Sequence, residues 1–397
     1  MHQLIDLTKN NGQPRRAPPE LSPALGPTMN KPNKTAAFAL SSLALAALAA
    51  CGGGGGGNSS STSANGTGAT TPPPTAAIAL LTPAGPSAGA FTPTGDVVAD
   101  SLSYANSMRL QLGLKAFNQS ATGPSGQPIT LIAKAAANHA LYLFDNNSTG
   151  HFETSGLPGY TGNAPADRVA AAGYTTNSVG EIAANIGGAF TSSTQAVDEL
   201  FDAPFHRAIF VFDTTNVGFG QGPTNSDPSK FSTLVGDFTD YVQNTPDNIL
   251  VAYPYNGQTN VKPSWIANES PNPMAAQPQY EGQTVGYPVT LSAAGNGAFS
   301  NINFMISDAS GNAVPCLETD NTNNSEATRL AMCVPFAPLA NNATYKVTVT
   351  GSLTNTTITA TPFSVSWSFT TGTPATAANK QLVPGRTTIP TIPTILN

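Results

Sequence analysis

The chain has 397 residues, of which 40% are hydrophobic and only 10% are charged, with 37 Gly and 34 Pro. This length allows two folded domains with tails, and the low charge argues against a charged cytosolic enzyme and is common in exported proteins that contain β-sheet. After Cys51 the chain has 11 basic and 20 acidic residues, so counterion release cannot drive binding to a phosphate backbone and nucleic acid is excluded as a partner.

The stretch MNKPNKTAAFALSSLALAALAAC, which begins at Met29, has the parts of a signal peptide. Lys31 and Lys34 form its positive region, residues 36–47 form its apolar core, and small residues follow. The polar residues before Met29 have no role in this pattern, which indicates that translation starts at Met29. We therefore interpret residues 1–50 as a leader that is removed.

The leader ends in LAAC, which resembles the bacterial lipobox, the motif whose cysteine is lipidated. Cys51 is the predicted lipidation site, and the alternative is an ordinary signal peptide with an incidental cysteine. Gly52 at the next position indicates outer-membrane sorting, by resemblance to the known sorting rule. The sequence thus predicts an exported lipoprotein of the cell envelope, held at the outer membrane or cell surface through its lipid.

Residues 51–97 consist largely of Gly, Ser, Thr, Pro and Ala. Such a segment buries too little apolar surface to offset its ordering entropy, so we predict a flexible linker. It contains GPSAG at residues 85–89, which matches the G-x-S-x-G pattern of serine hydrolases. No apolar strand leads into it, so we do not assign a nucleophile there.

Residues 98–242 show helical patterns followed by short strand-like runs. Helices are expected over residues 101–117, 131–146 and 194–203, and strands over residues 215–222 and 231–241. All three histidines after the leader, His139, His151 and His206, fall in this region. His139 lies on the apolar face of the second helix, where a hydrogen-bonded core histidine is expected.

The motifs of this region occur in a recognisable order: N…R…GL, HALYLFDNN, GHFE, ADRVAAAGY, GEIAANI, DAPFHRAIF and NVGFGQG. Together they resemble the bacterial branch of the CAP superfamily, named for cysteine-rich secretory proteins, antigen five and pathogenesis-related proteins. The resemblance covers about 145 residues. It implies an α-β-α sandwich with a central cleft, in which two histidines and one or two acids converge and, in many members, bind a divalent cation.

Carried over by motif, the cleft residues of this chain are His151, Glu181 and His206. Glu153, two residues after His151, is a further cleft-lining candidate. The chain also departs from the family pattern, with Ile182 where asparagine is usual, Leu200 where tryptophan is usual, and Ala203 where many eukaryotic members have a second glutamate. The resemblance therefore does not supply a full set of four ligands.

Two imidazoles and a carboxylate from three separate segments suit Zn²⁺ or another divalent cation, with water completing the site. Such binding should weaken below about pH 6, because the imidazoles must be deprotonated. The alternative is that His151 and His206 bind loop backbone and Glu181 and hold the cleft closed without metal. Asp167, Arg168 and Arg207 are expected to pair or cap.

Residues 243–373 show β-patterning, with strict alternation in ATYKVTVTGSL and FSVSWSFTTG. This predicts a β-sandwich that resembles bacterial Ig-like modules and serves as a spacer or adhesive module. Cys316 and Cys333 are an even pair in an exported chain, so a disulfide is expected. Residues 374–397 are predicted to be an extended tail. The predicted fold class is α+β, an α-β-α sandwich followed by an all-β Ig-like sandwich.

The expected function is that of a surface-tethered CAP-domain lipoprotein whose His/Glu cleft binds a small or apolar ligand or an envelope component, with or without metal. One alternative is a metal-assisted hydrolase that uses Glu181 as general base on a bound water. Another is an adhesion or scaffolding protein. The chain has no HExxH, no unpaired nucleophilic cysteine and no credible serine elbow, so binding is favoured over catalysis and no catalytic residue is assigned.

Overall fold

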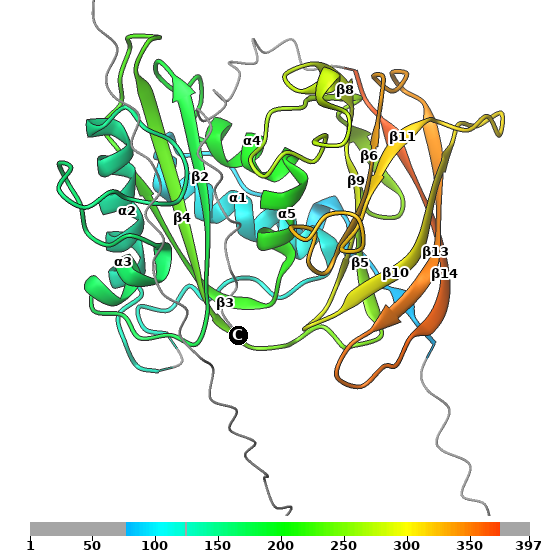
Figure 1. Ribbon diagram of the computed structural model, residues 1–397, viewed down its shortest axis with the longest axis horizontal. Helices are drawn as coiled ribbons and strands as arrows, with labels where there is room; N and C mark the ends of the chain where they lie inside the picture. Colours follow the sequence, from blue (N-terminus) through cyan, green and yellow to red (C-terminus); the bar gives the residue numbers. More distant parts are fainter. Residues whose placement is uncertain (1–76, 124, 374–397) are drawn as a thin grey trace, which may run out of the picture. The chain divides into compact units, whose positions relative to one another are not determined.

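The computed structural model describes residues 77–123 and 125–373, all within one compact unit (Figure 1). The predicted leader at residues 1–50, the lipidation site Cys51 and the tail at residues 374–397 lie outside the described residues. Within the described ranges, no helix is both long enough and apolar enough to cross a membrane.

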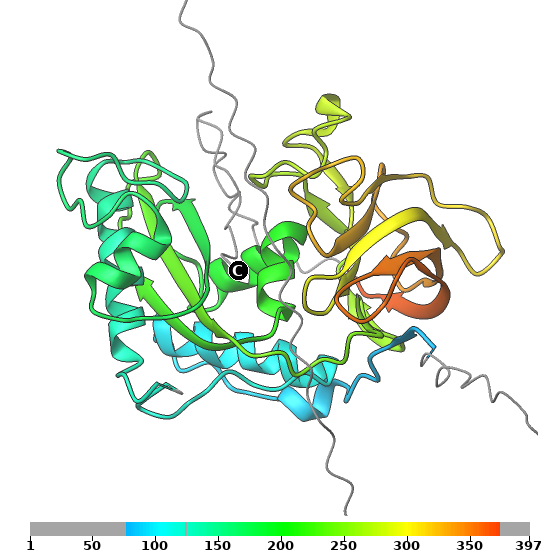
Figure 2. The same cartoon turned by 60° about the horizontal axis from the view of Figure 1, so that its bottom comes forward.

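Five helices and a three-stranded antiparallel sheet make up the first half of the described chain. The sheet order is β2-β4-β3. Figures 1 and 2 show α2 and α3 on one face of this sheet and α4 and α5 on the other, where α1 also packs. The elements are α1 (Val97–Leu112), α2 (Thr130–Asp145), α3 (Pro165–Ala171), β2 (Val179–Gly187), α4 (Gln195–Asp202), α5 (Pro204–Val211), β3 (Thr214–Gln221) and β4 (Phe231–Tyr241).

The first helix, α1, has a capping residue at each end. The Asp96 side chain accepts a hydrogen bond from the Ala99 backbone at 2.9 Å and caps the N-terminus of α1. Gly113 adopts a left-handed conformation with φ of 85° and closes the C-terminus. The helix therefore lies about four residues earlier than the period alone predicts.

The predicted flexible linker is wrong for its last part, which is built into the fold from Ala77 onward. Strand β1 (Ala79–Leu80) pairs in parallel with β5 (Ile249–Tyr253). The GPSAG stretch forms a short 3-10 helix, η1 (Pro86–Gly89), against α1. A Cβ on Gly89 would lie 2.2 Å from the Ser107 carbonyl oxygen, so this glycine permits η1 to pack closely on α1. The stretch is therefore explained by packing.

Helix α2 lies unusually close to β3. A Cβ added to Gly218 would lie 2.2 Å from the Ala133 nitrogen, and one on Gly220 would lie 2.1 Å from the Ala137 nitrogen. The glycines of NVGFGQG thus let the helix backbone rest directly on the strand. This contact holds α2 against the sheet and so positions the start of the loop that follows α2.

The second half is a β-sandwich with a small added hairpin, β7-β8. One sheet has the order β1-β5-β9-β12-β11 and the other β10-β13-β14-β6. On β13 and β14 the alternating residues are buried as the period predicts, including Val347, Val349 and Trp367. The elements after β5 are β6 (Gln258–Val261), β7 (Ser264–Ile266), η2 (Pro278–Tyr280), β8 (Thr284–Gly286), β9 (Val289–Ala293), β10 (Ala298–Ser307), β11 (Cys316–Thr319), β12 (Leu330–Pro335), β13 (Thr344–Thr354) and β14 (Thr361–Thr371).

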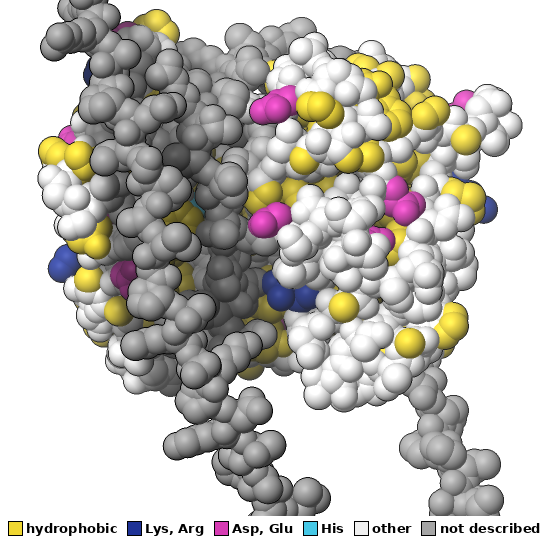
Figure 3. Space-filling view, viewed as in Figure 1, with side chains coloured by type: hydrophobic (Ala, Val, Ile, Leu, Met, Phe, Trp, Pro, Cys, Tyr) yellow, Lys and Arg dark blue, Asp and Glu magenta, His cyan; other side chains and the backbone are white. Residues whose placement is uncertain are grey.

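The outer surface of this half is polar but carries little charge. In Figure 3 white, which marks uncharged polar side chains and backbone, predominates over the strands, and Lys and Arg are few. This agrees with the low charge content of the whole sequence. The face seen in Figure 3 therefore offers no extended basic patch for a polyanion.

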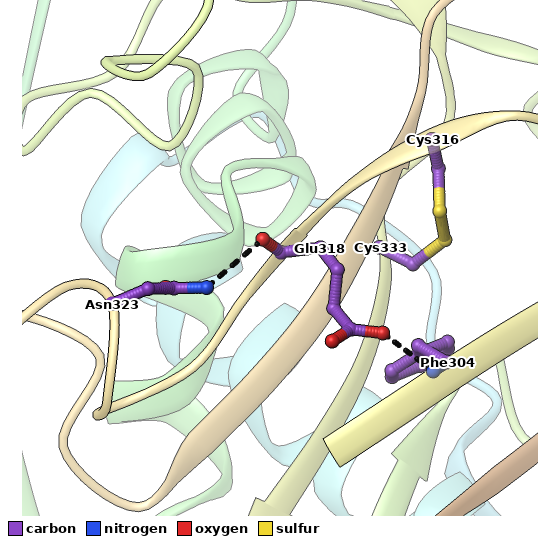
Figure 4. Close-up of a disulfide and its surroundings, with 5 residues drawn as sticks. All are labelled: Phe304, Cys316, Glu318, Asn323 and Cys333. Carbon is purple, nitrogen blue, oxygen red and sulfur yellow. Dashed lines mark hydrogen bonds between the residues drawn. A yellow bond between two sulfur atoms is a disulfide. The ribbon is translucent and has the colours of Figure 1, made fainter. Parts of the chain in front are cut away.

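The predicted pair Cys316 and Cys333 forms a disulfide between β11 and its neighbour β12, with the two Cα atoms 5.5 Å apart (Figure 4). Glu318, two residues further along β11, accepts a hydrogen bond from the Phe304 backbone on β10 at 2.5 Å, and its own carbonyl accepts one from Asn323. The disulfide therefore fastens an edge strand whose side chain also reaches the other sheet.

The two predicted domains meet along α5 instead of folding apart. Arg207 donates hydrogen bonds to the main-chain oxygens of Asp202 at 2.8 Å and of Pro288 at 2.9 Å. Its guanidinium also lies 4.5 Å from the centre of the Tyr253 ring. The Tyr287 hydroxyl donates to the Asp202 carboxylate at 2.7 Å. The predicted boundary at residue 243 separates two patterns in the sequence, but a single hydrophobic core runs across it.

Candidate functional site

Three imidazoles and several carboxylates gather around β2, between α2 and α5. His139 comes from the middle of α2, and His151 from the loop that follows it. Glu181 lies near the start of β2, and His206 in the first turn of α5. The rings of His151 and His206 have their centres 6.2 Å apart. The three residues that the motifs single out are thus brought together.

Glu181 is the centre of the cluster and is fully buried. One oxygen accepts from His151 Nδ1 at 2.9 Å and lies 3.6 Å from His139 Nε2, and the other accepts from Arg168 at 2.5 Å. Burial alone would raise the pKa of Glu181, but Arg168 and the two imidazoles more than offset it, so the pKa lies below its usual range. Glu181 is therefore an ionised carboxylate whose two oxygens are both engaged.

The two cleft imidazoles are oriented in the same way. His151 donates through Nδ1 to Glu181, and burial lowers the pKa of His151 despite that carboxylate, which favours the neutral ring. His206 donates through Nδ1 to Glu269 at 2.7 Å, and its backbone N–H donates to the same oxygen at 2.8 Å. Within the described residues neither Nε2 has a hydrogen-bond partner. Both rings therefore keep a lone pair free on Nε2.

Paired Nε2 atoms supported by carboxylates are a common arrangement for metal-binding histidines. At a Zn–N distance of about 2.0–2.1 Å, a ring centre lies about 3 Å from the ion. Two imidazole ligands of one tetrahedral ion have ring centres roughly 5 Å apart, so the rings of His151 and His206, at 6.2 Å, must move about 1 Å closer to share an ion. His151 and His206 are therefore the two candidate ligands for a divalent cation at this site.

The predicted ligand set of His151, Glu181 and His206 needs correction at Glu181. Across residues 77–123 and 125–373 no group of three or more His, Cys, Asp or Glu residues is arranged to hold a metal ion. The reason is that Arg168 and the imidazoles occupy both oxygens of Glu181. Glu181 therefore orients the His151 ring, and both of its oxygens are already engaged.

Glu153 does not replace Glu181 as a ligand. Its carboxylate accepts from His139 Nδ1 at 3.0 Å and from the Thr161 backbone at 2.6 Å, and it is buried. The other ring nitrogen of His139 bonds to the Gly150 carbonyl at 3.0 Å. His139 is thus the hydrogen-bonded core histidine that its helical position predicts. The pair anchors the loop that carries His151.

The three residues expected to pair or cap do so. Arg168 forms the ion pair with Glu181 and also donates to the His151 carbonyl at 3.0 Å. Asp167 accepts from the backbone of Ala164 at the start of α3. Arg207 binds main-chain oxygens along the contact with the β-sandwich, as described above.

Glu269 is the site residue that the sequence did not reveal. It follows β7 in the stretch WIANESPNP, 63 residues after His206 and outside the region with the family motifs. Its side chain is fully buried. No local pattern marks a lone glutamate in a loop, so only the packing of the β-sandwich against α5 identifies it.

A second carboxyl group lies beneath Glu181. Asp237 on β4 is the register partner of Glu181, is fully buried, and has no hydrogen-bond partner on either oxygen among the described residues. Burial, and then the charge of Glu181, raise the pKa of Asp237 well above its usual range. The folded protein therefore favours the protonated form of Asp237, and its proton can be directed towards Glu181.

Asp237→Asn should raise the free energy of unfolding increasingly as the pH rises above about 4. Below that pH, Asp237 is protonated in both the folded and unfolded states and costs nothing. Above it, the unfolded state ionises while the folded state keeps the proton, so wild type loses stability that the uncharged variant retains. Urea unfolding at pH 4, 6 and 8 measures this difference, with exposed Glu281→Gln as control. A difference that shrinks towards pH 8 would contradict the assignment.

No family model matches this chain, and no curated protein matches it either. Among solved structures, a partial match is the crystal structure of CopC from Methylosinus trichosporium OB3b, at 16% sequence identity. The match covers 31% of this chain and 91% of that chain, with a TM-score of 0.21. A likeness at this score does not bear on the histidine site or its ligand.

Proposed function

We propose that the protein is an exported CAP-superfamily lipoprotein whose paired imidazoles, His151 and His206, bind a divalent cation, Zn²⁺ being the best fit, and with it a small or apolar ligand or an envelope component. The observation that carries the proposal is the matched hydrogen bonding of the two rings, whose centres lie 6.2 Å apart. Each donates Nδ1 to a buried carboxylate and leaves Nε2 free. A purely structural histidine would be expected to use both ring nitrogens, as His139 does.

The order of the motifs supports membership of the CAP superfamily, and so do helices on both faces of a three-stranded antiparallel sheet. The disulfide supports an oxidising compartment outside the cytoplasm. Anchoring through a lipid on Cys51 is part of the proposal and is tested by metabolic labelling with a fatty acid.

Each residue of the site has a distinct task in this proposal. Glu181 and Glu269 fix the ring tautomers and aim both Nε2 atoms, while Arg168 keeps Glu181 ionised. A bound cation would act as a Lewis acid with open positions for an oxygen or nitrogen of the ligand.

Hydrolysis is the weaker alternative because its base is poorly suited. A general base needs a pKa near the working pH and a free oxygen within reach of water. The pKa of Glu181 is held low, and both of its oxygens are engaged. A binding protein therefore remains the better reading, and adhesion or scaffolding without metal is the outcome if the next test fails.

Wild-type protein should bind Zn²⁺ or Co²⁺ in calorimetric titration, whereas His151→Ala and His206→Ala should each abolish measurable binding because only two protein ligands are available. Glu269→Gln should weaken binding by about 10–100-fold, the usual effect of losing a carboxylate that orients a ligand. The exposed Glu281→Gln is the matched control and should bind like wild type. Equal metal affinity in wild type and both histidine variants would overturn the proposal.

A further inference from the structure

A hollow of about 460 Å³, including its open mouth, adjoins His206 on the side of the β-sandwich. It lies between α5, the loop after β7 and the loop before β12, which Figure 1 shows beside α5. Its apolar wall comes from Phe205, Ala208, Ile209, Pro271 and Leu330. Because much of this space is open to solvent, a ligand end would lie along the apolar wall and not be enclosed by it.

One carboxylate oxygen that lines this hollow and one next to it lack hydrogen-bond partners in the described residues. The Oε2 atom of Glu326, which lines it, is buried without a hydrogen bond. Glu269 precedes the lining residue Ser270, its side chain is fully buried, and its Oε2 atom also lacks a partner while Oε1 binds His206. Buried carboxylate oxygens without donors are costly unless a ligand supplies them.

Arg329 also lines the hollow but does not neutralise these acids. Its guanidinium stacks on the Phe212 ring at 4.2 Å, and it forms no ion pair with a carboxylate in the described parts of the chain. Phe212 is not part of the lining, so the guanidinium of Arg329 packs on a ring outside the hollow. Arg329 therefore leaves the Oε2 atoms of Glu326 and Glu269 without a donor.

We propose that this hollow binds the alkylammonium end of a ligand. The apolar wall holds a stem of a few carbons, and the unpaired oxygen of Glu326 accepts a hydrogen bond from the ammonium group. An anionic end is disfavoured by the two carboxylates. The inference rests on the proposed function, because His206 belongs both to the proposed metal site and to the lining of the hollow. It names the chemical class of a ligand that would reach from the hollow to the metal site.

The test uses three probes of equal length and different charge, pentylammonium, pentanol and pentanoate, titrated into the protein in EDTA and followed by NMR or calorimetry. Pentylammonium should bind at least about tenfold more tightly than pentanol, the effect of one charge-assisted hydrogen bond, and pentanoate should not bind. Glu326→Gln should lose that preference, and Glu281→Gln should keep it. Ala208→Met, which fills the hollow, should weaken both pentylammonium and pentanol.

A preference for pentanoate, or a preference for pentylammonium that Glu326→Gln leaves unchanged, would overturn the inference. If pentylammonium binds as expected, an acetylated Ala-Lys-Ala amide and its norleucine counterpart show whether a lysine side chain of a peptide can supply the ammonium group in place of a free amine. Because EDTA is present throughout, the two proposals fail separately. Zn²⁺ binding without amine binding sinks this inference alone, and amine binding without Zn²⁺ binding sinks only the metal site.

Discussion

Replacing Arg168 by methionine is expected to lower the free energy of unfolding by about 3–5 kcal/mol, the usual loss when one partner of a buried ion pair is removed. The guanidinium and the Glu181 carboxylate are both fully buried and lie 2.5 Å apart. Without Arg168, the carboxylate would face protonated Asp237 and two imidazoles in a site from which water is excluded. Urea unfolding at pH 7 measures the loss.

The double variant Arg168→Met/Glu181→Gln separates the uncompensated charge from lost packing. It should recover a large part of the loss, because the buried charge is gone along with its partner. If the double variant is as unstable as the sum of the single variants, the two side chains are not coupled and the central role given to Glu181 is wrong. A loss below about 1 kcal/mol in Arg168→Met would have the same meaning.

Gly220→Ala is expected to cost about 3 kcal/mol or more, at the upper end of what overpacking costs. The added Cβ would lie 2.1 Å from the Ala137 nitrogen, and this atom belongs to the backbone of α2, so no side-chain rotation relieves the clash. The helix must move off the sheet. Thermal or urea unfolding of the purified variant gives the change directly.

Gly180→Ala is the matched control for Gly220→Ala, because Gly180 lies on β2 of the same sheet. Its added Cβ would lie 3.4 Å from a methyl group of Ile209, an ordinary contact with a side chain that can adjust. This variant should change stability by less than about 1 kcal/mol. Similar losses in the two variants would show that α2 does not rest on β3 as described.

The local predictions succeed where a strong period meets a clear boundary. The helix expected over residues 131–146 is Thr130–Asp145, and the strand expected over residues 231–241 is Phe231–Tyr241. The alternation on β13 and β14 also matches the buried side chains. These elements follow from short-range patterns, because one face of each must be apolar to enter the core.

The linker prediction failed because residues 77–97 have no periodic pattern of apolar residues. Composition alone describes residues 77–97 as flexible, yet Leu80 packs against the core and β1 pairs with a strand 170 residues later. A two-residue strand has no period to detect. Its order comes from a partner strand, which the composition of the segment cannot indicate.

The sequence by itself determined which residues carry imidazoles, which of the longest periodic segments are helical or extended, and which two cysteines are available to pair. The tertiary structure alone decided which oxygen faces which nitrogen. Glu181 became an orienting group because Arg168 reaches it, and His206 acquired Glu269 from a loop 63 residues away. Hydrogen bonds act over about 3 Å, so they form between whichever side chains packing brings together. Their partners can be far apart in the sequence, and the sequence therefore does not identify them.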